Sequence, residues 1–264
     1  MNDATATRSR SAATGGCAPP PEAGRVHKPP HPIFAILFLY VVAEAVLWGA
    51  LAAVSETNAR LAIAYAALCF CIVSATHWIE SVEMRHVPAK LGLRRTSARW
   101  WGIALLVAAP GALTAAASAP APQSGGAWRW LALLSLLLWG ALWQEIFFRG
   151  FVFRRLMGRH GFLASAATAA FLLALAVLLE RAAAAPALPA YSPVVALLEL
   201  PLGFGLCQLF WMNGQSVWPG VVIRVALLAA LWIARAVWPF ALAATLLLLL
   251  GRVLFPRWQA PAST

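Results

Sequence analysis

The sequence is dominated by apolar runs that are each about as long as a membrane-spanning helix. A helix needs about 20 mostly apolar residues to cross a bilayer. Eight segments meet this rule: residues 33–54, 60–79, 99–118, 128–153, 162–182, 193–212, 217–235 and 237–254. Charged residues make up 11% of the chain, whereas soluble domains carry about 25%. The sequence therefore predicts an all-α, polytopic membrane bundle of about eight transmembrane helices, with a tight turn at Trp238 and Pro239 before the last one.

The two ends of the chain differ in composition from this bundle. Residues 1–32 are rich in Ala, Pro, Ser and Gly, and we expect a disordered cytosolic tail there. The bundle is expected over residues 33–256, and residues 257–264 form a short second tail. The first apolar run begins at Ile33 and is long enough to remain in the membrane, so a cleaved signal peptide is not predicted.

The distribution of basic residues predicts the orientation of the bundle. With a cytosolic N-terminus, the cytosolic segments hold 15 of the 20 basic residues: Arg8, Arg10, Arg25, Lys28, Arg85, Lys90, Arg94, Arg95, Arg99, Arg149, Arg154, Arg155, Arg159, Arg252 and Arg257. Cytosolic loops of membrane proteins carry such an excess. We therefore expect both termini in the cytosol and a multi-pass protein of the cytoplasmic (inner) membrane. The net charge of +11 follows from this topology, so no nucleic-acid partner is expected.

One apolar run ends in ionisable residues. Gln144, Glu145 and Arg149 follow Trp143 near the end of the fourth predicted span. Ionisable side chains inside a membrane are costly and usually face the protein interior, where they mark function. Glu145 and Arg149 are four residues apart, which places them on one face of a helix in the favourable order for an ion pair.

This pattern resembles the first motif of the CPBP family, which includes membrane-embedded CAAX prenyl endopeptidases and bacteriocin-processing, Abi-like proteins. The family motif has two acidic residues, three further residues, and then Arg and Gly. Here Gln144 stands at the first acidic position, followed by Glu145, Arg149 and Gly150. Two further segments add to the resemblance, the amphipathic stretch from Ala89 to Arg95 and the segment from Gln215 to Ile223. It covers a core of about residues 85–235.

The resemblance also implies where the remaining active-site residues should lie. The family has a Phe and a His four residues apart on the next helix, and a His and an Asn or Asp four residues apart on a later one. At these positions the chain has Leu173 and Val177, and then Arg224 and Leu228. Val and Leu cannot bind water or a metal, and an amide is not a base. The resemblance thus implies a degenerate active site made of Glu145 and Arg149 with the replaced positions Gln144 and Arg224.

Other candidate metal ligands are poorly placed for such a site. The five histidines, His27, His31, His77, His86 and His160, fall in the tail, at a helix end or in cytosolic loops. The cysteines have neither a disulfide nor a zinc-site spacing. We expect no metal and no cofactor.

Three functions remain open from the sequence. The first is a CPBP-type membrane protein that has lost peptidase chemistry, a pseudoenzyme that binds or helps assemble a peptide, lipoprotein or membrane protein in the lipid bilayer. The second is an active intramembrane peptidase that uses Glu145 as its base on a membrane-proximal peptide. The third is a permease or ion pathway built from Glu44, Glu145, Glu199 and Arg224.

The most specific structural prediction concerns Arg224. An arginine seven residues into a span is expensive against lipid and must find a partner or reach water. Its guanidinium does not deprotonate in proteins, so the partner must be a carboxylate or carbonyl groups. We expect Arg224 to pair with Glu145, with Glu199 nearby.

Overall fold

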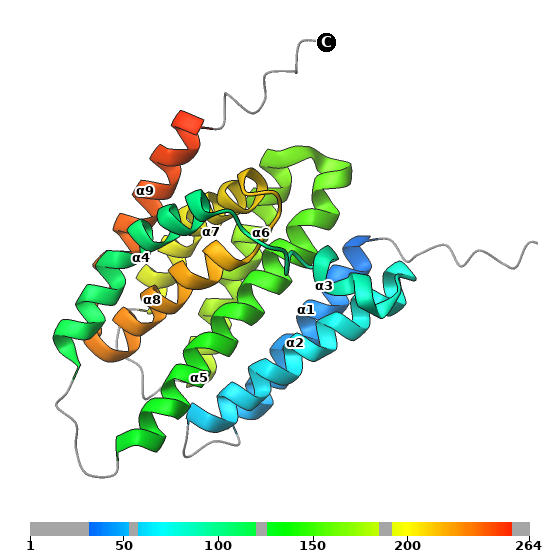
Figure 1. Ribbon diagram of the computed structural model, residues 1–264. Coiled ribbons are helices and arrows are strands. Elements are labelled where there is room, and N and C mark those ends of the chain that lie inside the picture. Colours follow the sequence, from blue (N-terminus) through cyan, green and yellow to red (C-terminus); the bar gives the residue numbers. More distant parts are fainter. Residues whose placement is uncertain (1–31, 53–57, 120–125, 185–191, 255–264) are drawn as a thin grey trace, which may run out of the picture.

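The computed structural model describes residues 32–52, 58–119, 126–184 and 192–254, and the two predicted tails lie outside these ranges apart from Pro32, where the first helix begins. Within them the fold is all-helical (Figure 1). The elements in chain order are α1 (Pro32–Ala52), α2 (Asn58–Glu80), η1 (Met84–His86), α3 (Val87–Lys90), α4 (Ala98–Ser118), α5 (Gly126–Glu145), η2 (Ile146–Phe153), α6 (Arg154–Ala184), α7 (Ser192–Met212), α8 (Trp218–Ala234) and α9 (Trp238–Leu254).

The long helices correspond closely to the predicted apolar runs. Four described segments are both long and apolar enough to cross a membrane: Ala62–Glu80, Ala98–Ser118, Trp130–Leu179 and Pro193–Met212. The helices α8 and α9 are apolar but shorter. The all-helical membrane bundle is thus confirmed, whereas a count of eight transmembrane helices stays a prediction.

The segment from Trp130 to Leu179 contains two predicted spans in one continuous helical stretch. Its first part ends in η2, a π-helix, and Gly161 then breaks the helical geometry with φ 72° and ψ 177°. A positive φ is costly for most residues and easy for glycine. Gly161 therefore lets the chain change direction between the two spans, close to where the second was predicted to begin.

The division between the last two helices differs from the prediction. Helix α8 ends at Ala234, and Arg235 adopts the left-handed conformation with φ 54°. Trp238 and Pro239 do not form the turn but begin α9. Proline is common in the first turn of a helix because the backbone N–H it lacks would be unsatisfied there.

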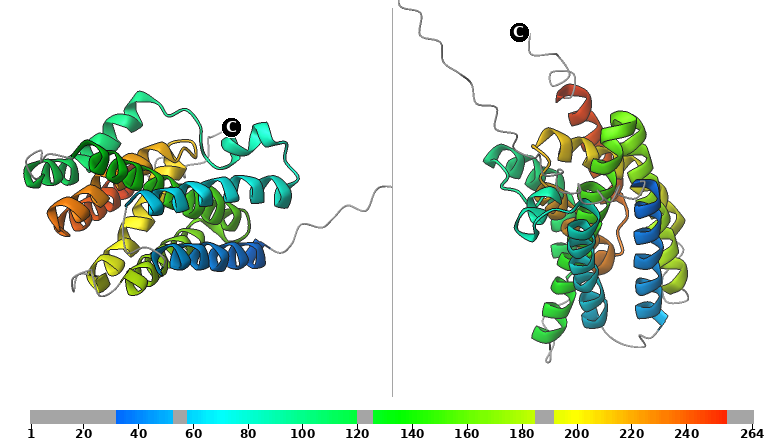
Figure 2. Two further views of the ribbon diagram at one scale, coloured as in Figure 1. Left: turned by 90° about the horizontal axis from the view of Figure 1, so that it is seen from below. Right: turned by 90° about the vertical axis from the view of Figure 1, so that its right-hand side faces the viewer.

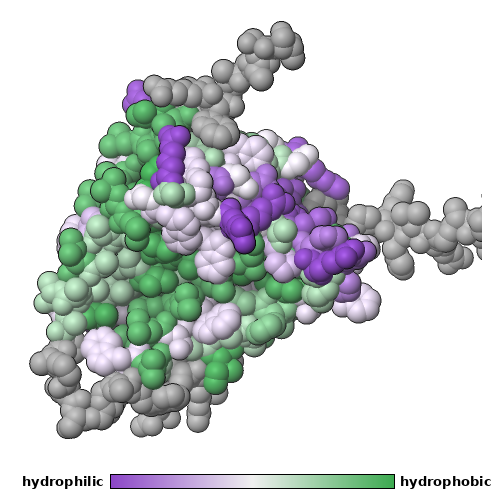
Figure 3. Space-filling model, viewed as in Figure 1, coloured by the Kyte–Doolittle hydropathy of each residue, from purple (hydrophilic) through white to green (hydrophobic). Residues whose placement is uncertain are grey.

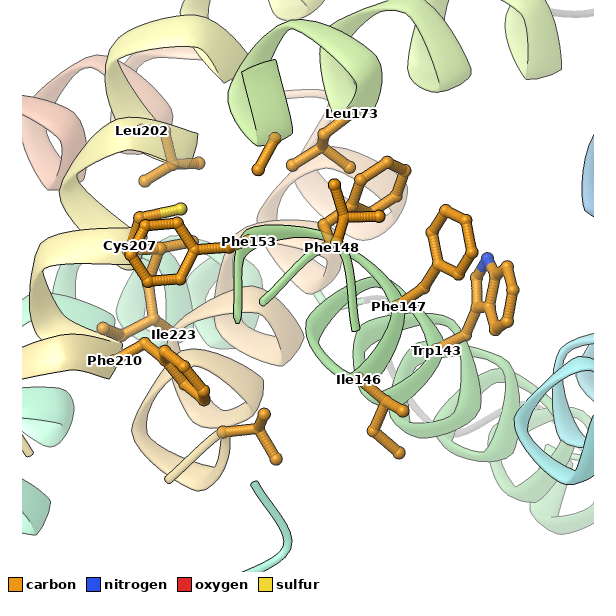
Figure 4. Close-up of a cluster of buried hydrophobic side chains, with 14 of the residues drawn as sticks. Trp143, Ile146, Phe147, Phe148, Phe153, Leu173, Leu202, Cys207, Phe210 and Ile223 are labelled. Atoms are coloured by element: carbon orange, nitrogen blue, oxygen red, sulfur yellow. The ribbon is translucent and has the colours of Figure 1, made fainter. Parts of the chain in front are cut away.

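Helix packing places the α5 and η2 segment inside the bundle. Helix α5 packs against α2 and α8, while η2 contacts α2, α6 and α7; α1 lies on the outside against α6 and α2 (Figure 2). Aromatic side chains fill the space around η2 (Figure 4). Trp143 stacks on Phe147 with ring centroids 4.9 Å apart, and Phe153 meets Phe210 edge-on at 6.0 Å.

The surface of the bundle is consistent with a membrane environment. Large apolar side chains are exposed along the helices, among them Phe38, Phe70 and Leu106, each about two-thirds exposed. Hydrophilic side chains gather instead at the end of the bundle that carries α3 (Figure 3). Exposed apolar bands of this kind fit lipid contact, and this matches the multi-pass membrane location expected from the sequence.

Candidate functional site

Glu145 lies at the junction of two kinds of helix. It is the last residue of α5 and directly precedes the π-helix η2. At the end of η2, the backbone N–H of Arg154 donates to the carbonyl of Arg149, five residues earlier. The side chains of Glu145 and Arg149 are both 1% exposed. Single-turn π-helices inside α-helices often occur at functional sites. The sequence offered no signal for this one.

The π-helix is covered by the segment that follows α3. A Cβ on Gly150 would lie closer to the carbonyl of Leu91 than van der Waals contact allows. Glycine at this position therefore lets the Leu91 backbone lie directly on η2. The amphipathic stretch predicted from Ala89 to Arg95 is only partly helical, since α3 ends at Lys90 and Gly92 has φ 83°.

Two segments that the sequence singled out separately are joined in the structure. The backbone N–H of Val217 donates to the carbonyl of Gly92 at 2.9 Å. Thr96 Oγ1 donates to Ser216 Oγ at 2.6 Å, and Ser216 Oγ donates to the carbonyl of Arg94 at 2.9 Å. The loop before α8 is thus fixed to the segment that covers η2, and this positions the start of α8 over Glu145.

An ion network connects α5, η2, α7 and α8. Glu145 Oε1 lies 3.2 Å from Arg224 Nε and 3.1 Å from Arg149 Nη1. Arg224 Nη1 donates to Glu199 Oε1 at 2.6 Å. The expected pairing of Arg224 with Glu145 is therefore confirmed, and Glu199 lies beside it. Two carboxylates and two guanidinium groups balance one another in charge, and each side chain is at most 2% exposed.

The network is held in place by close backbone contacts. Arg149 Nη2 donates to the carbonyl of Gly203 on α7 at 3.4 Å. Glu145 Oε2 lies against Gly220 in the first turn of α8. The glycine lets the carboxylate approach the helix backbone closely. Sequence reasoning missed this role for Gly220.

The other positions that the family resemblance predicts for a base and ligands are apolar or neutral. Gln144 is buried, and its Oε1 has no hydrogen-bond partner among the described residues. Val177 is buried on α6, and Leu228 lies half-buried on α8, four residues after Arg224 and so on the same face. The described histidines lie elsewhere: His77 near the end of α2, His86 in η1 and His160 beside the kink of α6.

A metal does not fit this set of residues. Within the described ranges, no group of three or more His, Cys, Asp or Glu side chains is arranged to hold a metal ion. A catalytic zinc needs about three protein ligands, and the carboxylates of Glu145 and Glu199 already face arginines. The expectation that the protein holds no metal stays a prediction.

Comparison with known proteins identifies the part of the chain that carries this network. Residues 126–230 match the family model described as type II CAAX prenyl endopeptidase Rce1-like. The match spans α5, η2, α6 and α7 and most of α8, so it includes all four members of the ion network. No curated protein matches the chain significantly.

Proposed function

Residues 126–230 carry a domain of the Rce1-like CAAX endopeptidase family, within the CPBP group of membrane proteins, and we propose that this domain has kept the family scaffold while losing peptide hydrolysis. The main support for this proposal is the position of Glu145. Its carboxylate is buried and faces Arg224 and Arg149 at 3.2 and 3.1 Å. The charges of Glu145, Arg149 and Arg224 then stabilise the bundle and do not activate water.

Hydrolysis needs a group that accepts a proton from water. Glu145 Oε1 already contacts Arg224 and Arg149, and Oε2 lies against Gly220, so neither oxygen is open to a water molecule. Gln144 cannot replace it, because an amide is not a base. Val177 and Leu228 offer no atom that could bind the water. The burial of Glu145, 1% exposed, further separates it from solvent.

The role that remains is binding. We propose that the protein is a multi-pass component of the cytoplasmic membrane, with both termini in the cytosol, that binds a peptide, a lipoprotein or another membrane protein without cleaving it. An ion pathway is less well supported. The described candidates Glu145, Glu199 and Arg224 meet at one place, whereas a pathway needs polar groups distributed across the membrane.

A peptidase assay tests this proposal. The full-length protein is reconstituted in lipid vesicles and incubated with a prenylated peptide that ends in a CAAX sequence, and the peptide mass is followed. The expected result is an intact peptide, with wild type and Glu145→Gln indistinguishable. Shortening of the peptide by wild type but not by Glu145→Gln would instead establish an active peptidase with Glu145 as its base. Equal shortening by both proteins identifies a contaminating peptidase.

A further inference from the structure

A second charged cluster lies at the end of the bundle that carries α3, outside the buried network. Glu80 is the last residue of α2, and its carboxylate contacts three basic side chains. Lys90 Nζ lies 3.0 Å from Oε2, Arg154 Nη2 lies 3.3 Å from Oε2, and Arg155 Nη2 lies 3.1 Å from Oε1. One carboxylate therefore joins the ends of α2 and α3 to the beginning of α6.

The charges of this cluster do not balance. Three cations share one carboxylate, and Arg94 lies near enough to Arg154 to repel it, as does Arg155. Arg94 is exposed, and its Nε donates to the carbonyl of Ala89 at 2.7 Å, which fixes the guanidinium beside the cluster. Glu83, the other acidic side chain described at this end, pairs with Arg85 at 2.6 Å. A net positive charge thus remains around Glu80.

The cluster is only partly hydrated. The side chains of Arg154 and Arg155 are 20% and 12% exposed, and the guanidinium of Arg155 lies 4.4 Å from the ring centroid of Phe151. Like charges that are partly removed from water repel one another more strongly than in bulk solvent. A bound anion would offset this repulsion.

The position of the cluster indicates which anion. Trp78, 79% exposed, precedes Glu80 by two residues near the end of α2, and tryptophan side chains favour the level of the lipid headgroups. The exposed apolar surface of the helices begins beside these hydrophilic residues (Figure 3). An anion at this level is most readily supplied by the membrane itself.

We propose that Lys90, Arg94, Arg154 and Arg155, the basic corner, bind the phosphate group of an anionic phospholipid. Arginine guanidinium groups match phosphate oxygens in geometry and form strong charge-assisted hydrogen bonds with them. Clustered basic residues at a membrane surface attract anionic lipids. The lipid phosphate supplies the negative charge that Glu80 alone does not, and it fastens α3 and the start of α6 to the same leaflet.

Lipid binding to the purified protein tests this proposal. The full-length chain in an uncharged detergent is titrated with phosphatidylglycerol, and retained lipids are counted by native mass spectrometry. We expect saturable binding of phosphatidylglycerol and weaker binding of phosphatidylcholine with the same acyl chains. Arg94→Gln should weaken the binding of phosphatidylglycerol about fivefold, while Arg94→Lys, which keeps the charge, should retain most of it.

Arg235→Gln removes an exposed charge between α8 and α9, away from the corner, and should leave lipid binding unchanged. Because Arg94 is exposed, its replacement is not expected to unfold the protein. The proposal is overturned if phosphatidylcholine binds as tightly as phosphatidylglycerol, or if Arg94→Gln binds phosphatidylglycerol like the wild type. Inorganic phosphate that displaces phosphatidylglycerol at equal concentration would assign the corner to a free anion instead.

Discussion

Gly220, in the first turn of α8, touches the carboxylate of Glu145 so closely that a methyl group on its α-carbon would overlap Oε2. The other oxygen of this carboxylate, Oε1, contacts Arg224 and Arg149. Glu145 is therefore enclosed between a helix backbone and two guanidinium groups. The glycine at position 220 of α8 therefore helps to set the surroundings of the Glu145 carboxylate.

Gly220→Ala tests the enclosure. The added methyl group must displace the Glu145 carboxylate from its arginine partners, so we expect a loss of stability of about 1–3 kcal/mol, as for other overpacked interiors. Gly102→Ala on α4 is the matched control, because a Cβ there meets nothing within 4 Å. That variant should be as stable as the wild type or more stable by roughly 0.5–1 kcal/mol, since alanine has a higher helix propensity than glycine. Unfolding in detergent measures both, and equal stabilities would contradict the close contact.

Topology can be tested with reporter fusions at both ends. Most basic residues of the described loops lie at the end of the bundle with α3, so we expect both termini on the cytosolic side. Arg149, which was counted with the cytosolic residues, is buried in the ion network and no longer contributes to this asymmetry. Reporters active only in the cytosol should be active at either terminus. A C-terminus on the opposite side would require an odd number of spans.

Metal content gives an independent test of the proposed loss of the catalytic site. Val177, Arg224 and Leu228 stand at the positions that the family resemblance predicts for ligands, and none of the three side chains is a zinc ligand. Elemental analysis of the purified and dialysed protein should therefore find well below one zinc per chain. Retention of one zinc per chain would show that the motif positions were assigned wrongly.

Much of the fold could be predicted because apolar runs of membrane length are explicit in the sequence. The predicted segments 99–118 and 193–212 differ by one residue or less at each end from α4 and α7. The turn before α9 lies earlier than predicted, because a proline in the first turn of a helix is compatible with its start and α9 therefore begins at Trp238. The π-helix was missed because its hydrogen-bond pattern leaves no mark in hydrophobic periodicity.

The candidate site was predictable to the extent that buried charge must be paired. An isolated arginine inside the bundle is costly, and this cost predicted that Arg224 pairs with Glu145. It also predicted that the carboxylate of Glu199 lies nearby. The contact of Glu145 with Gly220 could not be predicted in the same way. It depends on the distance between two helix backbones, which the docking of Ser216 and Val217 on the segment around Gly92 sets, and no residue type in the sequence encodes that distance.

Arg224 neutralises Glu145 inside a charge-balanced network, and a double-mutant cycle measures the coupling between the two side chains. Glu145→Gln leaves the network with one excess positive charge, and Arg224→Gln leaves one excess negative charge. Removing one partner of a buried pair costs about 3–5 kcal/mol, so each single variant should be strongly destabilised. The double variant keeps Arg149 and Glu199 and is again balanced in charge. We expect unfolding measurements to find the double variant more stable than either single variant, whereas losses of stability that simply add would show that Arg224 and Glu145 are not coupled.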